Sequence, residues 1–328
     1  MMRDILVTGA TGFLGSNLAG ALARQGYNVR ILRRPTSDLR ALVGIDVEHR
    51  LGDVRDRESL RSAMQGCDTV FHVAALVSYW GKQRPELYDI NIGGTANIVD
   101  TCLDLGIEKL VHTSSVAAVG FAGDRIPADE ITAFNWEDYD IGYRVSKHRA
   151  ELEVQRGVKL GLPAVIVNPS VIIGERDIHF NGGQIVRDVY QKRIFYAIDG
   201  GMSVVYVGDV VQGHIAAAAS GRVGERYILS GENLAHSQIV ASTAEVVGGW
   251  KPLAKLPLWA AKGLAAGSEI IADISNTKPW LARELIAGIT RTCWFSHEKA
   301  SRELGYTVTP FRTAVQRTFE WYKQHSMI

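Results

Sequence analysis

The chain has 328 residues, of which 46% are apolar and 22% are charged, and its formal net charge at pH 7 is +1. This composition allows a full hydrophobic core and excludes a disordered or fibrous chain, and the small net charge gives no general attraction to nucleic acid or to anionic membranes. The three cysteines lie far apart without a CxxC spacing, which favours neither a disulfide framework nor a metal site.

Short apolar segments alternate with helical patterns along the first half of the chain. Strands are expected at Ile5–Val7, Asn28–Leu32, Val47–Arg50, Thr69–Val73, Lys109–Thr113 and Pro163–Val167. Helices are expected between them at Phe13–Gln25, Asp56–Gln65, Glu86–Leu105 and Asp140–Leu160. Strands rich in Val, Ile and Leu, alternating with helices that end at glycine, are typical of a buried parallel sheet. We therefore predict an α/β fold built on a doubly wound parallel Rossmann sheet with right-handed crossovers.

The alternating pattern changes beyond about residue 175. Ser203–Val207 is expected to be a strand that returns to the sheet, followed by a helix at Asp209–Ser220 and a short strand at Arg226–Leu229. We predict a Rossmann domain of residues 1–175, to which residues 203–230 return, and a smaller C-terminal α/β substrate domain of residues 176–202 and 231–328.

The apolar stretch Leu258–Ile274 contains Lys262 and Glu269 among many alanines. It could lie on a membrane surface through an apolar face. A core or subunit-contact helix is favoured, because a single pair of charges does not make a basic polar face.

Three glycines follow the first strand in the segment TGATGFLG at residues 8–15. Gly9 allows a tight turn from strand to helix, Gly12 lets a pyrophosphate approach the backbone, and Gly15 lets the helix pack closely on the sheet. The N-terminus of the helix then presents unpaired N–H groups to the phosphates. The segment predicts a dinucleotide site, with an ordinary glycine-rich turn as the alternative.

The end of the second strand indicates the type of dinucleotide. Arg33 and Arg34 stand there, and the next acidic residue, Asp38, comes several positions later. An acidic residue at this place binds the ribose hydroxyls of NAD, whereas arginine accommodates the 2′-phosphate of NADP. We therefore expect NADP rather than NAD, the alternative being two arginines on a solvated surface turn.

Two further groups of residues lie where the cofactor is expected. Asp53 follows the third strand, where it either reaches the adenine amino group or forms a turn. Ala74 and Ala75 end the fourth strand, and such small residues leave room for a ligand at the carboxyl ends of the strands.

Tyr143 and Lys147 in the segment YRVSK are one helical turn apart and therefore share a face. A free phenol has a pKa of about 10, and a cation close by lowers that pKa by favouring the phenolate. Ser115, at the end of the fifth strand, is expected to offer a hydroxyl to the substrate oxygen. Its neighbour Ser114 is hard to separate from it by spacing, but the two point to opposite faces of the strand, so only one of them can serve. We predict hydride transfer between a nicotinamide and a carbonyl carbon, with Tyr143 exchanging the proton of the oxygen.

The segments TGATGFLG, HTSSVAAVG and YRVSK, in this order, resemble the extended short-chain dehydrogenase/reductase family, also called the NAD-dependent epimerase/dehydratase superfamily, over about residues 3–230. The resemblance implies that Ser115, Tyr143 and Lys147 are catalytic. It also places the segment from Phe71 to Ala75 along the cofactor and that from Asn168 to Val171 beside the nicotinamide. The full set of expected cofactor-binding residues is Gly9, Thr11, Gly12, Phe13, Leu14, Gly15, Arg33, Arg34, Asp53, Val54, Val73, Ala74, Ala75, Thr113, Tyr143, Lys147, Pro169 and Val171.

The run from His72 to Thr95 is similar to both dihydroflavonol-reductase-like and hopanoid-associated epimerase-like proteins, and Asn91 in it is either a cofactor-loop residue or a helix cap. Arg33 and Arg34 depart from the acidic residue usual in sugar-nucleotide epimerases. We therefore expect an NADPH-dependent reductase of a ketone or aldehyde on a small to medium apolar molecule. The alternatives are a nucleotide-sugar epimerase or dehydratase with tightly bound NAD, and a non-catalytic NADP-sensing module.

The expected partner is a small-molecule substrate. Its pocket is expected near Ser78–Gly81 and Ile173–Asn181, with Tyr79, Trp80 and Phe180 as an apolar wall. We expect a homodimer, paired through the two long helices as is common in this family, or a monomer. No segment approaches the ~20 apolar residues of a spanning helix and no signal peptide is recognised, so a cytoplasmic location is expected.

Overall fold

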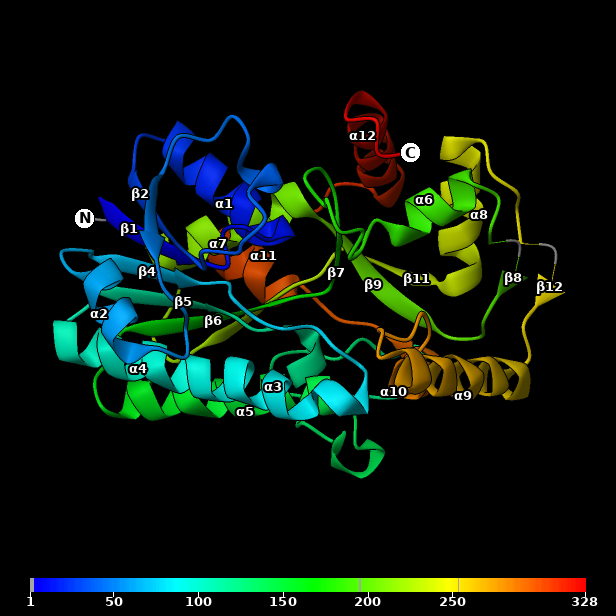
Figure 1. Cartoon of the computed structure of the whole chain (residues 1–328), viewed down its shortest axis with the longest axis horizontal. Coiled ribbons are helices and arrows are strands. Elements are labelled where there is room, and N and C mark those ends of the chain that lie inside the picture. Colours follow the sequence, from blue (N-terminus) through cyan, green and yellow to red (C-terminus); the bar gives the residue numbers. More distant parts are fainter. Residues whose placement is uncertain (1–2, 195, 253) are drawn as a thin grey trace.

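The computed structural model of the chain describes residues 3–194, 196–252 and 254–328. Its larger lobe is built on a parallel sheet whose described strands run in the order β10-β6-β5-β4-β1-β2-β3 (Figure 1). These strands are β1 (Asp4–Thr8), β2 (Asn28–Arg33), β3 (Glu48–Leu51), β4 (Thr69–His72), β5 (Lys109–Thr113), β6 (Ala164–Pro169) and β10 (Arg226–Leu229). The strand order reverses at β1 and β4, the switch point at which open α/β sheets bind ligands. The predicted doubly wound parallel sheet is confirmed.

Helices cover both faces of this sheet (Figure 1). One face carries α1 (Phe13–Arg24), α7 (Val207–Ser220) and α11 (Glu298–Leu304), and the other carries α2 (Arg57–Met64), α4 (Gly94–Leu105) and α5 (Gly142–Lys159). Successive side chains of a strand point to opposite faces, so β1 contributes Ile5 and Val7 to one core and Leu6 to the other. The continuous apolar sequence of the strands follows from this double cover.

The helix expected at Glu86–Leu105 is interrupted. It consists of α3 (Arg84–Tyr88) and α4, joined by a π-helical turn at Asp89–Gly93. Asn91 lies buried inside this turn, and its backbone carbonyl accepts a hydrogen bond of 2.6 Å from the Thr95 hydroxyl. A π turn inserts one extra residue into the helical repeat, which apolar periodicity alone does not reveal.

The strand expected at Ser203–Val207 does not return to the large sheet. It forms β9 (Gly201–Tyr206) of a second sheet, with β7 (Val171–Ile173), β11 (Glu232–Ala235) and β13 (Thr292–Cys293) as its neighbours. The strand that returns to the large sheet is β10, which pairs with β6. Val204 packs in the core of the smaller lobe and Val205 in that of the larger lobe. Because both faces of β9 are buried, its apolar sequence fits a strand of either sheet.

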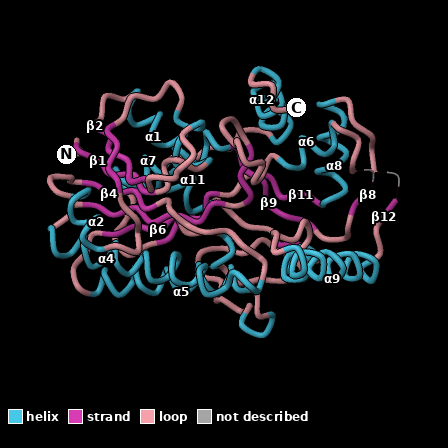
Figure 2. The backbone as a smooth tube through the Cα atoms, in the orientation of Figure 1, coloured by secondary structure: helices cyan, strands magenta, loops and turns pink. Residues whose placement is uncertain are grey.

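The smaller lobe packs helices against β9. Its core is formed with α6 (Gln184–Tyr190), α8 (His236–Val247) and α12 (Phe311–Gln324), and its outer edge carries α9 (Leu258–Ser275), α10 (Arg283–Ile289) and the strand pair β8 (Tyr196–Ala197) and β12 (Ala254–Lys255). The chain begins at β1 and ends after α12 (Figure 2). Ala300 and Tyr306, expected in the smaller domain, pack in the core of the larger lobe; the division into two domains stays a prediction.

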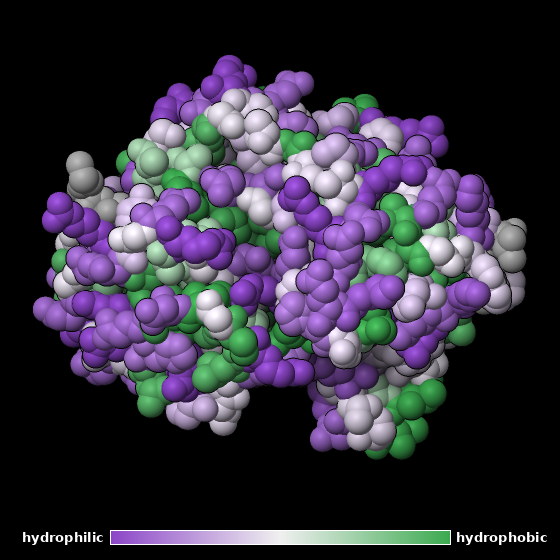
Figure 3. Space-filling model, turned by 90° about the horizontal axis from the view of Figure 1, so that it is seen from above, coloured by the Kyte–Doolittle hydropathy of each residue, from purple (hydrophilic) through white to green (hydrophobic). Residues whose placement is uncertain are grey.

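Short 3-10 turns connect several of these elements, at Arg40–Leu42, Gly81–Gln83, Val116–Ala118 and Glu137–Tyr139. Seen from above, the surface of the molecule is mainly hydrophilic, with hydrophobic side chains in small groups between the polar ones (Figure 3).

Candidate active site

The glycine loop is folded too tightly for any larger residue. Gly9 has a φ of 70°, and a Cβ placed on it lies 2.6 Å from the backbone nitrogen of Ala74. A Cβ on Gly15 lies 2.2 Å from the Gly9 carbonyl oxygen. The loop therefore holds the start of α1 against the ends of β1 and β4, next to the switch point of the sheet.

This loop and the neighbouring strand ends fit a dinucleotide. No side chain caps α1 at Gly12, so the first N–H groups of the helix are open to a phosphate. Among the described residues, Ser114 Oγ, Asn168 Oδ1 and Ser170 Oγ are buried without a hydrogen-bond partner. These three side chains lie at the carboxyl ends of β5 and β6, where unsatisfied polar groups indicate a missing polar ligand.

Two arginines stand at the end of β2. The Arg33 Nε–H donates to His49 Nδ1 at 3.0 Å, and the Arg34 backbone N–H donates to Ser37 Oγ at 3.0 Å. Within the described chain, neither guanidinium forms an ion pair with a carboxylate. Both cations are therefore left for an external anion.

Asp53 is already bound within the chain. Arg55 donates to its carboxylate from Nε at 3.0 Å and from an Nη at 2.8 Å. This hydrogen-bonded contact lowers the pKa of Asp53. The contact of Asp53 with the adenine amino group stays a prediction.

The predicted catalytic residues come together where β5 ends and α5 begins. Tyr143 lies in the first turn of α5 and Lys147 one turn later, and both are buried. The Lys147 ammonium donates to the backbone carbonyl of Thr113, the last residue of β5, at 2.7 Å. Ser115 Oγ accepts a hydrogen bond of 3.1 Å from the Ala117 N–H, and the Ser115 side chain lies near enough to Tyr143 to lower the pKa of its phenol. Of the two candidate serines, Ser115 is thus the one whose side chain influences Tyr143.

The electrostatics of Tyr143 differ from the expectation. Burial raises the pKa of the Tyr143 phenol above its ordinary value of 10, and Tyr79 adds to this rise, while Ser115 and the Arg144 cation oppose it. Lys147 does not contribute to this shift, so the lowering of the Tyr143 pKa expected from Lys147 is not found in the chain by itself. Burial also lowers the pKa of Lys147 to about 8, against an opposing contribution from Glu151.

Behind the predicted catalytic residues lies a buried network that sequence reasoning missed. Glu151 forms an ion pair with Arg226 and accepts a hydrogen bond of 2.6 Å from Asn168. Asn168 also donates to the backbone carbonyl of Ser115 at 2.9 Å. The network therefore fixes the strand end that presents Ser115. Its one visible signal is the spacing of Tyr143, Lys147 and Glu151, which places all three on one face of α5.

Asn91 is neither a helix cap nor free to face a cofactor. Its side chain accepts a hydrogen bond of 2.8 Å from Leu76 N–H and donates to the Leu76 carbonyl at 2.9 Å and to Ser146 Oγ at 3.0 Å. Asn91 thus ties the loop after β4 to α5, three residues beyond Tyr143.

A small pocket opens beside Tyr79, and none of the predicted catalytic residues lines it. It has a volume of about 170 Å³ and lies between the loop that holds Tyr79 and Trp80 and the segment around Trp280. The ring of Tyr79 packs edge-on against the ring of Tyr143 at a centroid distance of 5.5 Å. Tyr79 and Trp80 therefore line a pocket as expected. Phe180 does not: it packs against Tyr322 at 4.9 Å, in the core of the smaller lobe.

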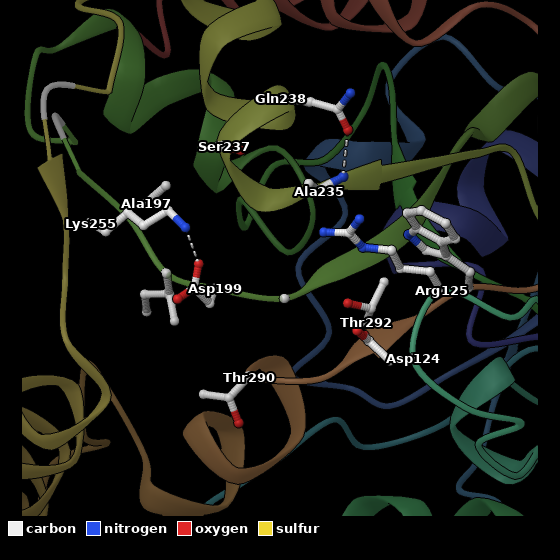
Figure 4. A pocket seen from close by; sticks show the side chains of 13 residues that line it. Asp124, Arg125, Ala197, Asp199, Ala235, Ser237, Gln238, Lys255, Thr290 and Thr292 are labelled. Carbon is white, nitrogen blue, oxygen red and sulfur yellow. Dashed lines mark hydrogen bonds and ion pairs between the residues drawn. The ribbon is translucent and has the colours of Figure 1, made fainter.

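A larger polar pocket of about 540 Å³ lies in the smaller lobe (Figure 4). Lys255 and Asp199 form an ion pair of 2.7 Å at its side, and Gln238 accepts a hydrogen bond from the Ala235 N–H at 2.8 Å. None of the predicted site residues lines this pocket.

Comparisons with known proteins agree on one family. The family described as the NAD dependent epimerase/dehydratase family matches residues 5–230. The chain is 34% identical to a putative dihydroflavonol 4-reductase of Synechocystis sp., over 100% of this chain and 97% of that protein. It is 33% identical to sterol demethylase protein B of Methylococcus capsulatus, over 98% of this chain and 99% of that protein. The crystal structure of gox2253 matches with a TM-score of 0.86 at 37% identity, covering 99% of each chain.

Proposed function

Because the chain belongs to the NAD-dependent epimerase/dehydratase family, we propose that it is an NADPH-dependent reductase of a ketone or aldehyde. The chain is an NAD(P)-dependent oxidoreductase of the extended short-chain dehydrogenase/reductase type. Its proposed substrate is a small to medium apolar molecule that carries the ketone or aldehyde. The observation that carries the proposal is the position of the buried Tyr143 and Lys147 one turn apart on α5, with the Lys147 ammonium bound to the end of β5 at 2.7 Å, next to Ser115.

The three side chains have separate tasks in the reduction of a carbonyl group. When bound, NADPH supplies the hydride that adds to the carbonyl carbon. The Ser115 and Tyr143 hydroxyls hold the carbonyl oxygen, and Tyr143 gives it the proton. The raised pKa of Tyr143 supports this direction, because a buried neutral phenol keeps its proton until charge develops on the substrate oxygen.

Lys147 does not lower the pKa of Tyr143 in the chain by itself; its proposed task is to stabilise the phenolate that the proton transfer leaves behind when cofactor and substrate fill the site. Its ammonium is held at the Thr113 carbonyl, one helical turn from Tyr143. The positive charge there favours the ionised phenol at the moment it forms, and the buried surroundings strengthen that attraction. The Glu151 carboxylate, next along the same helix face, supports the protonated form of Lys147.

The preference for NADPH rests on Arg33 and Arg34. Neither guanidinium has a carboxylate partner within the described chain, and Arg34 lies close enough to Asp53 to lower the pKa of that carboxylate. A forked guanidinium suits a phosphate dianion. We expect NADPH to bind at least about tenfold more tightly than NADH, a difference of about 1.4 kcal/mol.

The test of the proposed reaction is Tyr143→Phe, assayed by loss of NADPH absorbance over a panel of apolar ketones and aldehydes. We expect turnover to fall by about 10²- to 10⁴-fold, while the Kd for NADPH stays within about twofold. Ser115→Ala is expected to lower turnover in the same way. Turnover of Tyr143→Phe within a few-fold of the wild type contradicts the mechanism.

The same purified protein distinguishes the reductase from an epimerase or dehydratase. A reductase exchanges its cofactor with solution and oxidises one NADPH for each substrate molecule. Cofactor that stays bound through purification, with no net oxidation during turnover of a nucleotide sugar, would replace the proposed reductase by the epimerase or dehydratase.

A further inference from the structure

The helix α9 buries its small residues and exposes its large apolar residues, the reverse of the usual arrangement. Its buried face consists of small or polar side chains: Ala261, Ala265, Ser268, Glu269 and Ala272. Its exposed large residues are Leu258, Trp259, Leu264, Ile270, Ile271 and Ile274. Trp259 is 77% exposed and Ile274 is 83% exposed. The core position expected for this stretch therefore applies only to its small residues.

A surface helix normally turns its large apolar side chains toward the core. On α9, which lies at the edge of the smaller lobe (Figure 1), the large apolar side chains are exposed instead. A cluster of exposed large apolar residues on one helix marks a surface that binds another apolar body. The reversal indicates that this face is covered when the protein works.

The exposed face of α9 continues into the pocket beside Tyr79. Trp280 follows α9, is 64% exposed and lines that pocket with Trp80. Trp80 Nε1–H donates to Asp273 of α9 at 3.2 Å, and Lys82 donates to Asn276 at 2.9 Å. The end of α9 is thus bonded to the loop whose Tyr79 ring contacts Tyr143. Whatever binds α9 lies next to the pocket that Trp80 and Trp280 line, and Tyr79 separates that pocket from Tyr143.

The charges around α9 favour an anionic surface. Lys262 and Lys278 are exposed, and in the described chain neither has a carboxylate partner. Glu269 is paired with Arg283, whereas Asp273 accepts from the neutral Trp80 N–H and keeps its charge. The exposed Lys82 lies beside the end of α9 as well, so among the described residues there the three lysines exceed the one unpaired carboxylate by two positive charges. Tryptophan rings prefer the boundary between lipid tails and water, and Trp259 and Trp280 flank the face. No helix of the described residues could cross a bilayer, so a surface position is the one available.

We propose that α9 and Trp280 form a docking surface for an anionic lipid bilayer, and that the reductase substrate is an apolar carbonyl compound dissolved in that bilayer. The compound enters between Trp80 and Trp280 toward Tyr143. The substrate class rests on the proposed function, whereas the docking does not. Apolar side chains seated in the lipid boundary and lysines at the headgroups together account for the composition of this face.

A second copy of the chain is the competing occupant. Gly263 and Gly267 lie on the same face, and a Cβ at either position meets nothing within 4 Å. Two small residues at this spacing allow a second helix to approach closely. A bulky residue at Gly267 blocks such a contact but adds apolar surface for lipid. The substitution Gly267→Leu therefore separates the two occupants.

The experiment is co-sedimentation of the full chain with vesicles of equal parts phosphatidylglycerol and phosphatidylcholine, against vesicles of phosphatidylcholine alone. We expect binding to the anionic vesicles, at least about tenfold weaker for the double variant Trp259→Ser with Ile274→Ser. Lys262→Gln and Lys278→Gln are each expected to weaken it about fivefold. The matched control is Ile131→Ser, since Ile131 is 90% exposed elsewhere on the surface and should leave vesicle binding unchanged.

Three readouts decide the inference. Gly267→Leu should bind anionic vesicles at least as well as the wild type. If the wild type does not bind anionic vesicles, the docking is overturned. It is also overturned if light scattering shows a dimer that Gly267→Leu and Ile274→Ser both abolish, because a second copy of the chain then covers α9. Circular dichroism and the Kd for NADPH show that each variant is folded.

The substrate part is tested separately from the docking. Turnover of a vesicle-dissolved ketone should fall in the double variant, while turnover of a water-soluble ketone stays unchanged. Equal loss on both substrates overturns the entry route. Vesicle binding without any Tyr143-dependent reduction contradicts the proposed function but leaves the docking intact.

Discussion

Gly15 offers the sharpest test of the glycine loop. A methyl group at this position lies 2.2 Å from the Gly9 carbonyl oxygen, 2.7 Å from its carbonyl carbon and 2.8 Å from the Ala10 Cα. Ordinary contact begins at 3.4 Å, so the loop and the start of α1 must separate by about 1 Å. All three neighbours are backbone atoms, which cannot rotate away as a side chain does. We therefore expect Gly15→Ala to lower the free energy of unfolding by about 3 kcal/mol, at the upper end of overpacking costs.

The same shift moves the first N–H groups of α1 away from the phosphates. We expect the Kd for NADPH to rise at least about tenfold in Gly15→Ala, equivalent to about 1.4 kcal/mol of binding free energy. Urea denaturation followed by circular dichroism gives the free energy of unfolding, and titration with NADPH fluorescence gives the Kd.

Gly263→Ala is the matched control, because it makes the same change in the open. A methyl group on Gly263, inside α9, meets nothing within 4 Å, and alanine is favoured over glycine in a helix interior by about 0.8–1.0 kcal/mol. The free energy of unfolding should rise by about that amount, with NADPH binding unchanged. If Gly15→Ala retains wild-type stability and NADPH affinity, the argument from the tight loop is refuted.

Three further changes test the site. Burial lowers the pKa of Lys147 from 10.5 to about 8, so between these pH values the folded chain binds fewer protons than the unfolded chain. In urea denaturation, the free energy of unfolding of the wild type relative to Lys147→Met should therefore rise by up to about 3 kcal/mol from pH 8 to 10.5. A difference between the two proteins that stays constant over this range contradicts the shift. Glu151→Gln leaves the Arg226 guanidinium without its counter-charge and should lower the free energy of unfolding by about 3 kcal/mol. Adding Arg226→Met should restore part of this loss in a double-mutant cycle. If the losses of the two single variants simply add, the pairing of Glu151 with Arg226 is contradicted. Arg33→Ala with Arg34→Ala should cut the preference for NADPH over NADH at least about tenfold, and an unchanged ratio of Kd values contradicts their role.

Local chemistry made much of the fold and of the site predictable from the sequence. The spacing of Gly9, Gly12 and Gly15 after an apolar strand predicts a tight turn, and the structure shows contacts that leave no room for a side chain at Gly9 and Gly15. Tyr143 and Lys147 share a helix face because their separation equals one helical turn. The alternation of apolar strands and helices predicted the doubly wound sheet, since both faces of such strands are buried.

Only the tertiary structure decided what depends on residues distant in the chain. Glu151 meets Arg226 across the sheet, and the sheet to which β9 belongs is chosen by pairing and not by its own residues. The direction of the Tyr143 pKa shift follows from the depth of burial, which the motif does not contain. The outward face of α9 is a property of packing as well: its sequence predicts an apolar helix, but which residues face solvent depends on the small space that α10 leaves for alanines. Short-range spacing specified the predicted catalytic residues, and long-range packing determined their electrostatics, the network behind them and the exposed face of α9.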